Sequence, residues 1–389
     1  MGSLLSGRFV LAWLLSFSSG LAFFLFVHFP RYLEDLGAST TEIGVVVAST
    51  ALAAIAIRPA LGRVMDRRGR RPVILAGSAV HLLALVLYPT IDSIGPWLYT
   101  VRVLHGLGEA LTFASIFTYA ADLVPEGRRA QGLALFGVSG MLPIAVGGIL
   151  GDALLSRGDF DAVFTAAIIL GAVALLLAIP LRESAAPAPD ATRISFTASL
   201  TQRDLLPLWW VTLVFSFALT AYFTFLRTFV DTTGVGSVGT FFGAYAGTAI
   251  TLRLVAGWVP DRLGLTRVLY PSMILFAAGL VVISSARSGG AIAFAGVLCG
   301  AGHGYGFPIL YALSFGRALE GSRGSASAIF TGLFDMGALV GAPVLGAIVA
   351  WLDYPAMFRI AAVWVLGGLT WFALWERSLA RRTTRLSLT

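Results

Sequence analysis

The stretch RPALGRVMDRRG, residues 58–69, returns in a degenerate form as RLVAGWVPDRLG, residues 253–264. Six of the twelve positions are identical, and the two copies are separated by 195 residues, about half of the 389-residue chain. In both copies an apolar run ends in a charged turn. A repeat that relates two whole halves in this way is typical of a two-lobed membrane transporter.

The composition indicates a protein that crosses a membrane many times. Hydrophobic residues make up 57% of the chain, charged residues 12%, and the mean hydropathy is +0.86, whereas soluble domains contain about 25% charged residues. All 27 basic residues are arginines, mainly in short loops between apolar runs. They are therefore interpreted as topology signals, and no nucleic-acid partner is expected. The single cysteine, Cys299, excludes a disulfide framework within the chain.

Twelve apolar runs are long enough to cross about 30 Å of hydrocarbon. They predict an all-α membrane protein with twelve transmembrane helices in two pseudo-symmetric six-helix lobes. The predicted organisation is an N-terminal lobe over 1–180, a cytoplasmic linker over 181–204, a C-terminal lobe over 205–376 and a basic cytoplasmic tail over 377–389. The twelve runs are 8–29, 41–61, 73–90, 96–124, 132–155, 160–180, 205–230, 238–259, 266–286, 290–316, 323–351 and 355–376.

Arginines concentrate in the loops after the second, fourth, eighth and tenth runs and in the C-terminal tail. Because cytoplasmic loops carry an excess of arginine and lysine, both termini and the linker are predicted to be cytoplasmic. The first run is of full spanning length and is treated as the first helix, not as a removed signal.

The loop GRVMDRRGRRP, residues 62–72, closely resembles the hallmark G-x-x-x-D-R-x-G-R-R stretch of the major facilitator superfamily. The resemblance implies a bacterial-type inner (plasma) membrane protein with a cytoplasmic-side latch that stabilises an outward-open state. Asp122 is the expected partner of one latch arginine; the alternative is that these arginines only set topology. The predicted latch residues are Arg58, Gly62, Asp66, Arg67, Gly69, Arg70, Asp122, Arg253, Gly257, Asp261 and Arg262.

A second cluster of ionisable residues lies on the fourth run, RVLHGLGEA at 102–110. Helical spacing places Arg102, His105 and Glu109 on one face. The stretch resembles the R-x-x-Q-G-x-G-A-A motif of proton-coupled family members, with His105 and Glu109 as departures. Glu109 is the predicted proton carrier with Arg102 as its modulator, and a static Arg102–Glu109 bridge is the alternative. His105 is either a hydrogen-bonding residue or a proton relay.

Other residues complete the predicted transport machinery. Asp335, near the middle of the eleventh run, is predicted to be a second proton or substrate site. Gly147 and Gly151 with Gly243 and Gly247 are expected to form a packing seam on the outer side. In the resembled family, the first, fourth, seventh and tenth helices line a central cavity. The cavity candidates are Phe17, Phe113, Phe117, Tyr222, Phe225, His303, Tyr305 and Tyr311.

The predicted function is a proton-coupled secondary transporter that exports small amphipathic or aromatic compounds by alternating access. We expect it to work as a monomer whose partners are the substrate, protons and the lipid bilayer. It is not expected to be an enzyme, and no metal or cofactor is expected; the chain has no lysine, so it has no Walker-type ATP loop. The alternatives are a proton-driven importer of a small organic anion that uses Arg102, a membrane enzyme that uses His105 and Glu109, and a sensor.

Overall fold

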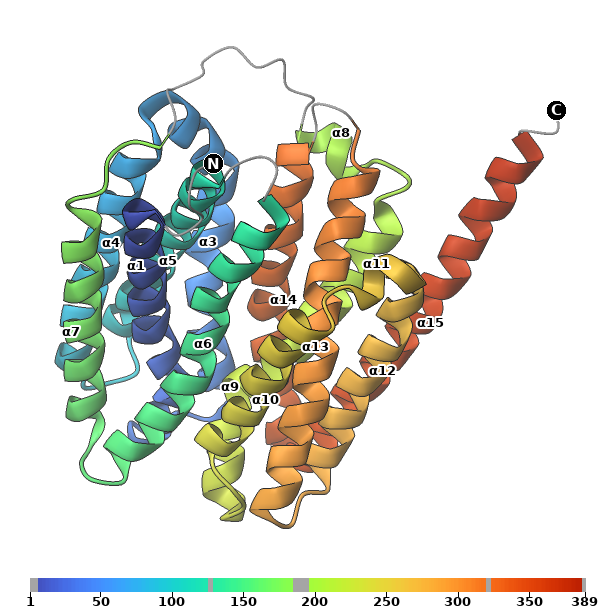
Figure 1. Cartoon of the computed structure of the whole chain (residues 1–389). Helices are drawn as coiled ribbons and strands as arrows, with labels where there is room; N and C mark the ends of the chain where they lie inside the picture. The colour runs from blue at the N-terminus through green and yellow to red at the C-terminus, as the bar shows by residue number, and fades with distance from the viewer. Residues whose placement is uncertain (1–5, 125–128, 185–195, 320–322, 387–389) are drawn as a thin grey trace.

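The computed structural model describes residues 6–124, 129–184, 196–319 and 323–386, and over these residues the regular structure is entirely helical. Figure 1 shows the bundle, with the helices of the first half coloured blue to green and those of the second half yellow-green to red. The first half consists of α1 (Gly7–Phe24), η1 (Leu25–His28), α2 (Phe29–Asp35), α3 (Thr40–Arg68), α4 (Arg70–Leu87), η2 (Tyr88–Thr90), α5 (Pro96–Leu123), α6 (Arg129–Leu155) and α7 (Phe160–Ala178).

The second half repeats this arrangement after a five-residue helix, α8, in the predicted linker. It consists of α8 (Phe196–Leu200), α9 (Leu206–Thr233), α10 (Val238–Val255), α11 (Val259–Leu263), α12 (Leu265–Ser284), α13 (Gly289–Arg317), α14 (Arg323–Trp351) and α15 (Tyr354–Leu386). The helices match the predicted runs closely. The exception is α15, which continues as a helix to Leu386 through much of the predicted tail and projects from the bundle in Figure 1.

Eleven helical segments of the described chain are apolar and long enough to span a membrane. The remaining predicted crossing, α5, has 28 residues, or about 42 Å at 1.5 Å per residue. Its polar residues Arg102, His105 and Glu109 make it the least lipid-like helix of its lobe, so it has to be covered by neighbours. It packs between α3 and α4.

Glycines allow this close packing of α5. A Cβ atom on Gly106 would overlap the backbone carbonyl of Thr50 in α3, and a Cβ on Gly108 would overlap the backbone of His81 in α4. Only residues without side chains let three backbones approach so closely. The G-x-G spacing of 106 and 108 therefore fixes α5 against two neighbours at once.

The two ends of the bundle are named here by their turns. The Gly69 end holds the turn between α3 and α4, where Gly69 has a φ of 86°, and the Ser39 end holds the turn in which Ser39 caps α3. Two helix pairs make the main lobe-to-lobe contacts, α3 with α14 and α6 with α10, and α9 also contacts α2 and η1. These contacts gather toward the Ser39 end, where the Thr40 hydroxyl donates to the Gly346 carbonyl.

The α6–α10 pair forms the predicted seam, but through partly different glycines. A Cβ on Gly148 would lie 3.2 Å from the Cβ of Phe242, and a Cβ on Gly239 would lie 2.9 Å from the Cα of Ile149. Of the four predicted glycines, only Gly243 meets the opposite helix, where a Cβ would lie 3.6 Å from the Ile149 side chain. The other three do not: Gly147 and Gly151 face Phe24 and His28 of their own lobe, and no atom lies within 4 Å of a Cβ on Gly247. The helices therefore cross nearer to Gly148 and Gly239 than the sequence prediction placed the seam.

Candidate functional site

Three ionisable residues from three helices meet where the lobes face each other. Nε of Arg58, on α3, donates to Oδ2 of Asp335, on α14, and the two side chains are 14% and 17% exposed. This ion pair joins the two lobes. Glu109, on α5, is partly exposed and interacts electrostatically with both partners. Arg58 is thus hydrogen-bonded to one carboxylate and attracted electrostatically by a second.

Arg102 lies on the same helix as Glu109, and no ion pair joins the two in the described chain. Its Nε donates to the Val46 carbonyl at 3.2 Å and one terminal nitrogen donates to the Val47 carbonyl at 3.4 Å, both on α3. The guanidinium also lies over the Phe29 ring, 5.2 Å from its centroid. The static Arg102–Glu109 bridge is therefore wrong for this conformation, and Arg102 instead ties α5 to the α3 backbone.

His105 belongs to a buried polar chain within the N-terminal lobe. Its Nδ1 is 2.8 Å from the Tyr88 hydroxyl and its Nε2 is 3.2 Å from Nε2 of His81. Nδ1 of His81 is 3.3 Å from the Ser19 hydroxyl, and Arg102 donates to the Tyr88 hydroxyl at 3.1 Å. An uninterrupted series of hydrogen bonds therefore connects Arg102 to Ser19.

Arg102 can only donate, so the Tyr88 hydroxyl accepts from it and keeps its own proton to donate. If Tyr88 donates to His105, then His105 donates from Nε2 to His81, and His81 donates from Nδ1 to Ser19. This direction gives the fully buried Tyr88 hydroxyl an acceptor and leaves the spare proton on Ser19, which is 7% exposed. Both imidazoles are then neutral, each with one defined tautomer.

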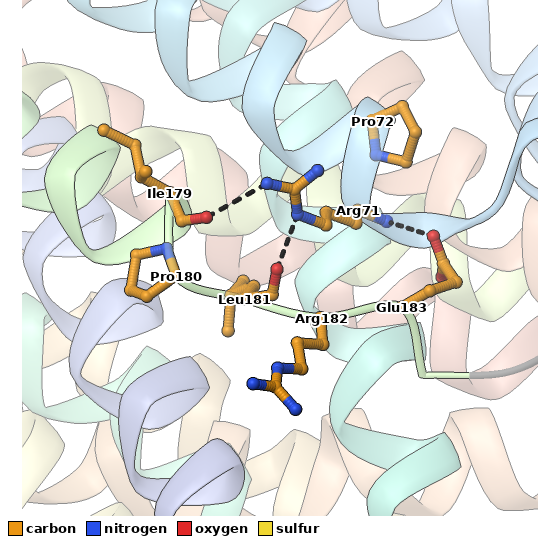
Figure 2. Close-up of a pocket in the computed structure, with 7 residues that line it drawn as sticks. All are labelled: Arg71, Pro72, Ile179, Pro180, Leu181, Arg182 and Glu183. Atoms are coloured by element: carbon orange, nitrogen blue, oxygen red, sulfur yellow. Dashed lines mark hydrogen bonds between the residues drawn. The ribbon is translucent and has the colours of Figure 1, made fainter.

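The predicted latch turn is held by two acids, the first of which, Glu183, is shown with Arg71 in Figure 2. The Glu183 carboxylate accepts from the backbone N–H groups of Arg70, at 2.8 Å, and Arg71, at 3.2 Å, at the start of α4. The Arg71 side chain donates to the carbonyls of Ile179 and Leu181, so the chain after α7 wraps the turn. A Cβ on Gly69 would overlap the Glu183 carboxylate, which adds to the need for glycine set by its positive φ.

Arg70 forms the second contact, with Nε 3.0 Å from Oδ2 of Asp122. Asp122 was the acid expected to pair with a latch arginine, and Glu183 was not foreseen. Three further predicted latch residues, Gly62, Asp66 and Arg67, have their backbone in α3, and their side-chain surroundings lie outside the described part of the structure.

The second copy of the latch motif is built differently. Arg262 lies over the Trp258 ring, 4.8 Å from its centroid, and Asp261 is exposed. Gly257 is also exposed, next to the start of the short helix α11. Arg253, the counterpart of Arg58, donates from Nε to the Gly304 carbonyl at 3.2 Å. The two arginines are therefore equivalent in position and have different partners.

The predicted cavity aromatics divide into two groups. Tyr222 and Phe225 are fully buried in the packed core of the C-terminal lobe, and His303 is 9% exposed beside Tyr245. The others are partly or well exposed: Phe17, Phe113, Phe117, Tyr305 and Tyr311. Only the second group could contact a solute in this conformation.

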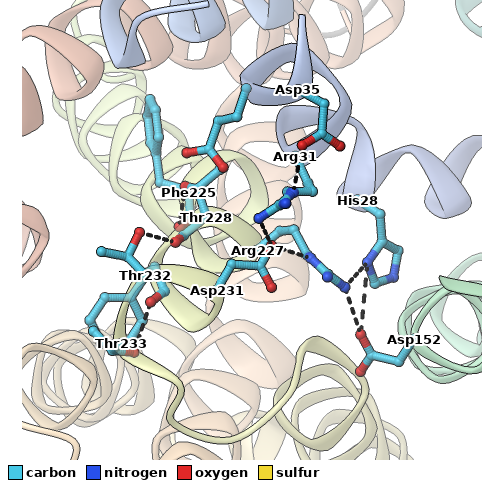
Figure 3. A network of polar contacts seen from close by, with 12 residues as sticks. His28, Arg31, Asp35, Asp152, Phe225, Arg227, Thr228, Asp231, Thr232 and Thr233 are labelled. Carbon is cyan, nitrogen blue, oxygen red and sulfur yellow. Dashed lines mark hydrogen bonds and ion pairs between the residues drawn. The ribbon is translucent and has the colours of Figure 1, made fainter. Parts of the chain in front are cut away.

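A network of charged residues closes the Ser39 end (Figure 3). Arg227 of α9 donates from Nε to Asp231, four residues further along the same helix, at 2.8 Å. It also reaches across the lobes to Asp152 of α6 at 3.2 Å and to Nδ1 of His28 at 3.2 Å. Asp152 in turn accepts from the backbone N–H of Gly239 at 2.6 Å. Sequence patterns carry no signal for these interlobe partners, because they are far apart in the chain.

Comparisons with known proteins agree with this architecture. The family model described as Major Facilitator Superfamily matches residues 11–331 and 232–387. "Multidrug resistance protein MdtL" of Escherichia coli (strain K12 / DH10B) is 25% identical over 319 residues, covering 78% of this chain and 79% of that protein. The same values hold for the MdtL of Shigella boydii serotype 18.

Two solved transporters share the fold. The nucleoside transporter NupG has a TM-score of 0.74 at 16% identity, covering 95% of this chain and 99% of that chain. The human organic anion transporter MFSD10 (TETRAN) has a TM-score of 0.72 at 17% identity, covering 94% and 98%. The lobes are thus those of the major facilitator fold, the protein is a multi-pass membrane transporter and not an enzyme, and the chain belongs to the Major Facilitator Superfamily.

Proposed function

We propose that this transporter couples the export of small amphipathic or aromatic compounds to proton movement through Glu109 and Asp335. The observation that carries the proposal is the interlobe ion pair of Arg58 with Asp335, whose two members both interact electrostatically with Glu109. With both acids ionised, the three groups carry a net charge of −1, and one proton neutralises them. Binding of a proton to one acid can therefore change which of the two carboxylates forms an ion pair with Arg58.

The mechanical consequence follows from where the pair lies. Arg58 and Asp335 belong to α3 and α14, one of the two main interlobe helix pairs. Protonation of Asp335 removes the charge attraction between α3 and α14 and leaves Arg58 free to turn toward Glu109 of its own lobe. A proton would thus favour separation of α3 from α14, and its release would favour their contact, as alternating access requires.

The direction of transport rests on two further points. Arginine-rich loops at the Gly69 end favour a cytoplasmic location for that end and for both termini, in a bacterial-type inner membrane. Interlobe contacts gather at the Ser39 end, so this conformation is the one in which the outer side is closed. The name of the MdtL relatives, multidrug resistance protein, supports export of drug-like compounds.

The test is substrate-driven proton flux in proteoliposomes that contain a pH-sensitive dye, with drug-like aromatic compounds as substrates. Glu109→Gln and Asp335→Asn are expected to abolish proton flux while substrate still binds, and Arg58→Gln is expected to uncouple the two movements. Asp92→Asn, an exposed acid in the loop before α5, is the matched control and should transport normally. Unchanged proton flux in both acid variants would contradict the proposal.

A further inference from the structure

The two interlobe helix crossings are pseudo-symmetric copies of each other. Gly44 of α3 packs against Ala342 and Pro343 of α14, and Gly239 of α10 packs against α6 at Ile149, next to Gly148. Gly44 and Gly239 differ by 195 residues, as do Pro343 and Gly148. Residues that are 195 positions apart therefore occupy equivalent places at the two crossings, and the repeat extends from the order of the helices to their packing.

Residues at the same distance from each crossing, counted along the helices, occupy equivalent positions in the two lobe interfaces. Arg58 follows Gly44 by 14 residues and Asp335 precedes Pro343 by eight. On the other side, Arg253 follows Gly239 by 14 residues and position 140 precedes Gly148 by eight. Because the rise per residue is the same in all four helices, about 1.5 Å, the counterpart of the Arg58–Asp335 pair is Arg253 with position 140.

Both acids of the first site are missing from the second. Position 140 is glycine where its counterpart is Asp335, and Gly304 stands where its counterpart is Glu109. Arg253 donates from Nε to the carbonyl of Gly304, and it has no carboxylate partner among the described residues. The second site therefore keeps the cation of the first without either of its counter-charges.

The place of the missing acid is also open. No atom lies within 4 Å of a Cβ on Gly140 or on Gly137, the counterpart of Gly332, whereas a Cβ on Gly332 would meet the Arg58 side chain at 3.8 Å. Arg253 itself is partly exposed. A cation at membrane depth is costly without a counter-charge, and a guanidinium suits a carboxylate in particular because it can donate two parallel hydrogen bonds.

We propose that Arg253, together with the open space beside Gly137 and Gly140, is a subsite for an acidic group on the transported compound. The substrate carboxylate would occupy the position that Asp335 occupies at the first site, and the partly exposed Tyr305 next to Gly304 could contact its aromatic part. This inference rests on the proposed export function and narrows its substrates to amphipathic organic anions.

The test compares binding of 2-naphthoate with that of neutral 2-naphthamide by isothermal titration calorimetry on purified protein in nanodiscs. The wild type is expected to prefer the carboxylate by about tenfold or more, as for a charge-assisted hydrogen bond. Arg253→Gln should remove that preference. So should Gly140→Asp, which supplies an internal carboxylate, whereas the isosteric Gly140→Asn should retain it. Absence of a preference in the wild type, or its persistence in Arg253→Gln, would overturn the inference.

A second measurement tests the geometry without a ligand. Gly140→Asp should raise the midpoint of thermal unfolding relative to Gly140→Asn when Arg253 is present, and should lose that advantage in the Arg253→Gln background. Equal effects in both backgrounds would overturn the proposed juxtaposition. Asp335→Asn separates this inference from the coupling mechanism, because it should abolish proton flux and leave the preference for 2-naphthoate intact.

Discussion

At the scale of single residues, one carboxylate holds the turn at the Gly69 end. Glu183 accepts from two backbone N–H groups at the start of α4, where the helix dipole also favours a negative charge. Glu183→Ala leaves both donors without this acceptor and should cost about 1–2 kcal/mol. We expect the midpoint of thermal unfolding to fall by about 1–2 °C in nanodiscs.

The neighbouring Arg182 provides the control for this prediction. Its side chain points away from the turn in Figure 2, while its backbone carbonyl accepts from Tyr119 and would survive truncation. Arg182→Ala should therefore unfold at nearly the wild-type temperature. Glu183→Gln should lie between the two, because an amide oxygen still accepts but carries no charge. Equal midpoints for Glu183→Ala and Arg182→Ala would show that the turn does not depend on this contact.

Contacts of single side chains were predicted from the sequence in some cases and missed in others. Asp122 could be named as a partner of a latch arginine because it ends a predicted helix on the same side as the turn. Glu183 could not, because it lies outside any periodic run and acts through backbone groups. The partner of Arg58 was also missed, since Asp335 is 277 residues away and helical periodicity carries no information on contacts between lobes.

At the scale of helices, the α6–α10 crossing controls how closely the lobes approach at the Ser39 end. Gly148 and Gly239 give the helices their contact, so Gly148→Leu should hold α6 and α10 apart. Spin labels at Asp92→Cys and Arg287→Cys, in a Cys299→Ala background, lie on different lobes and are exposed. We expect pulsed electron resonance to show a longer distance between them in Gly148→Leu.

Gly247→Leu is the matched control for this helix pair, since no atom lies within 4 Å of a Cβ at that position. It adds the same side chain to the same helix pair, two turns beyond the contact. The label distance should stay at the wild-type value. If Gly247→Leu lengthened the distance as much as Gly148→Leu, the crossing would not lie at Gly148.

Helix boundaries were the most predictable feature of this chain, because each run of apolar residues is bounded by charged or glycine-containing turns. The seam was predicted on the correct pair of helices and with partly wrong glycines. A helix of this kind has glycines on several faces, and α6 carries Gly147, Gly148 and Gly151 close together. Which of them meets the partner depends on helix rotation, and the rotation is set by the packing of the whole lobe.

At the scale of the whole molecule, the two lobe interfaces are alike in geometry and unlike in charge. The α3–α14 side carries an interlobe ion pair at mid-helix, while the α6–α10 side carries its ionic contact at the Ser39 end, between Asp152 and Arg227. Both contacts hold the Ser39 end closed. A third interlobe ion pair, Arg31 with Asp231 at 3.8 Å, lies at the same end. Opening the Ser39 end therefore requires the loss of all three ion pairs, one of which includes a proposed proton acceptor.

The Asp152–Arg227 contact should favour the state that is closed at the Ser39 end over the state that is closed at the Gly69 end. Its side chains are 23% and 16% exposed, so the pair is partly shielded from water. Removing the charge of Asp152 also weakens the hydrogen bond that its carboxylate accepts from the Gly239 N–H. We expect Asp152→Asn to favour opening of the Ser39 end by about 1–2 kcal/mol, which changes the population ratio about 5- to 30-fold.

Alternating access also predicts a change at the Gly69 end in the Asp152→Asn variant. If the lobes move as two rigid bodies, opening at the Ser39 end must bring the Gly69 end together. Labels at Arg182→Cys and Arg267→Cys, on opposite lobes and exposed, should therefore move closer in Asp152→Asn while the Asp92–Arg287 labels move apart. Arg359→Gln, an exposed cation of α15 that bonds only within its own helix in the described chain, should change neither distance. A change at the Ser39 end without an opposite change at the Gly69 end would mean that this contact closes a local gate and does not couple the lobes.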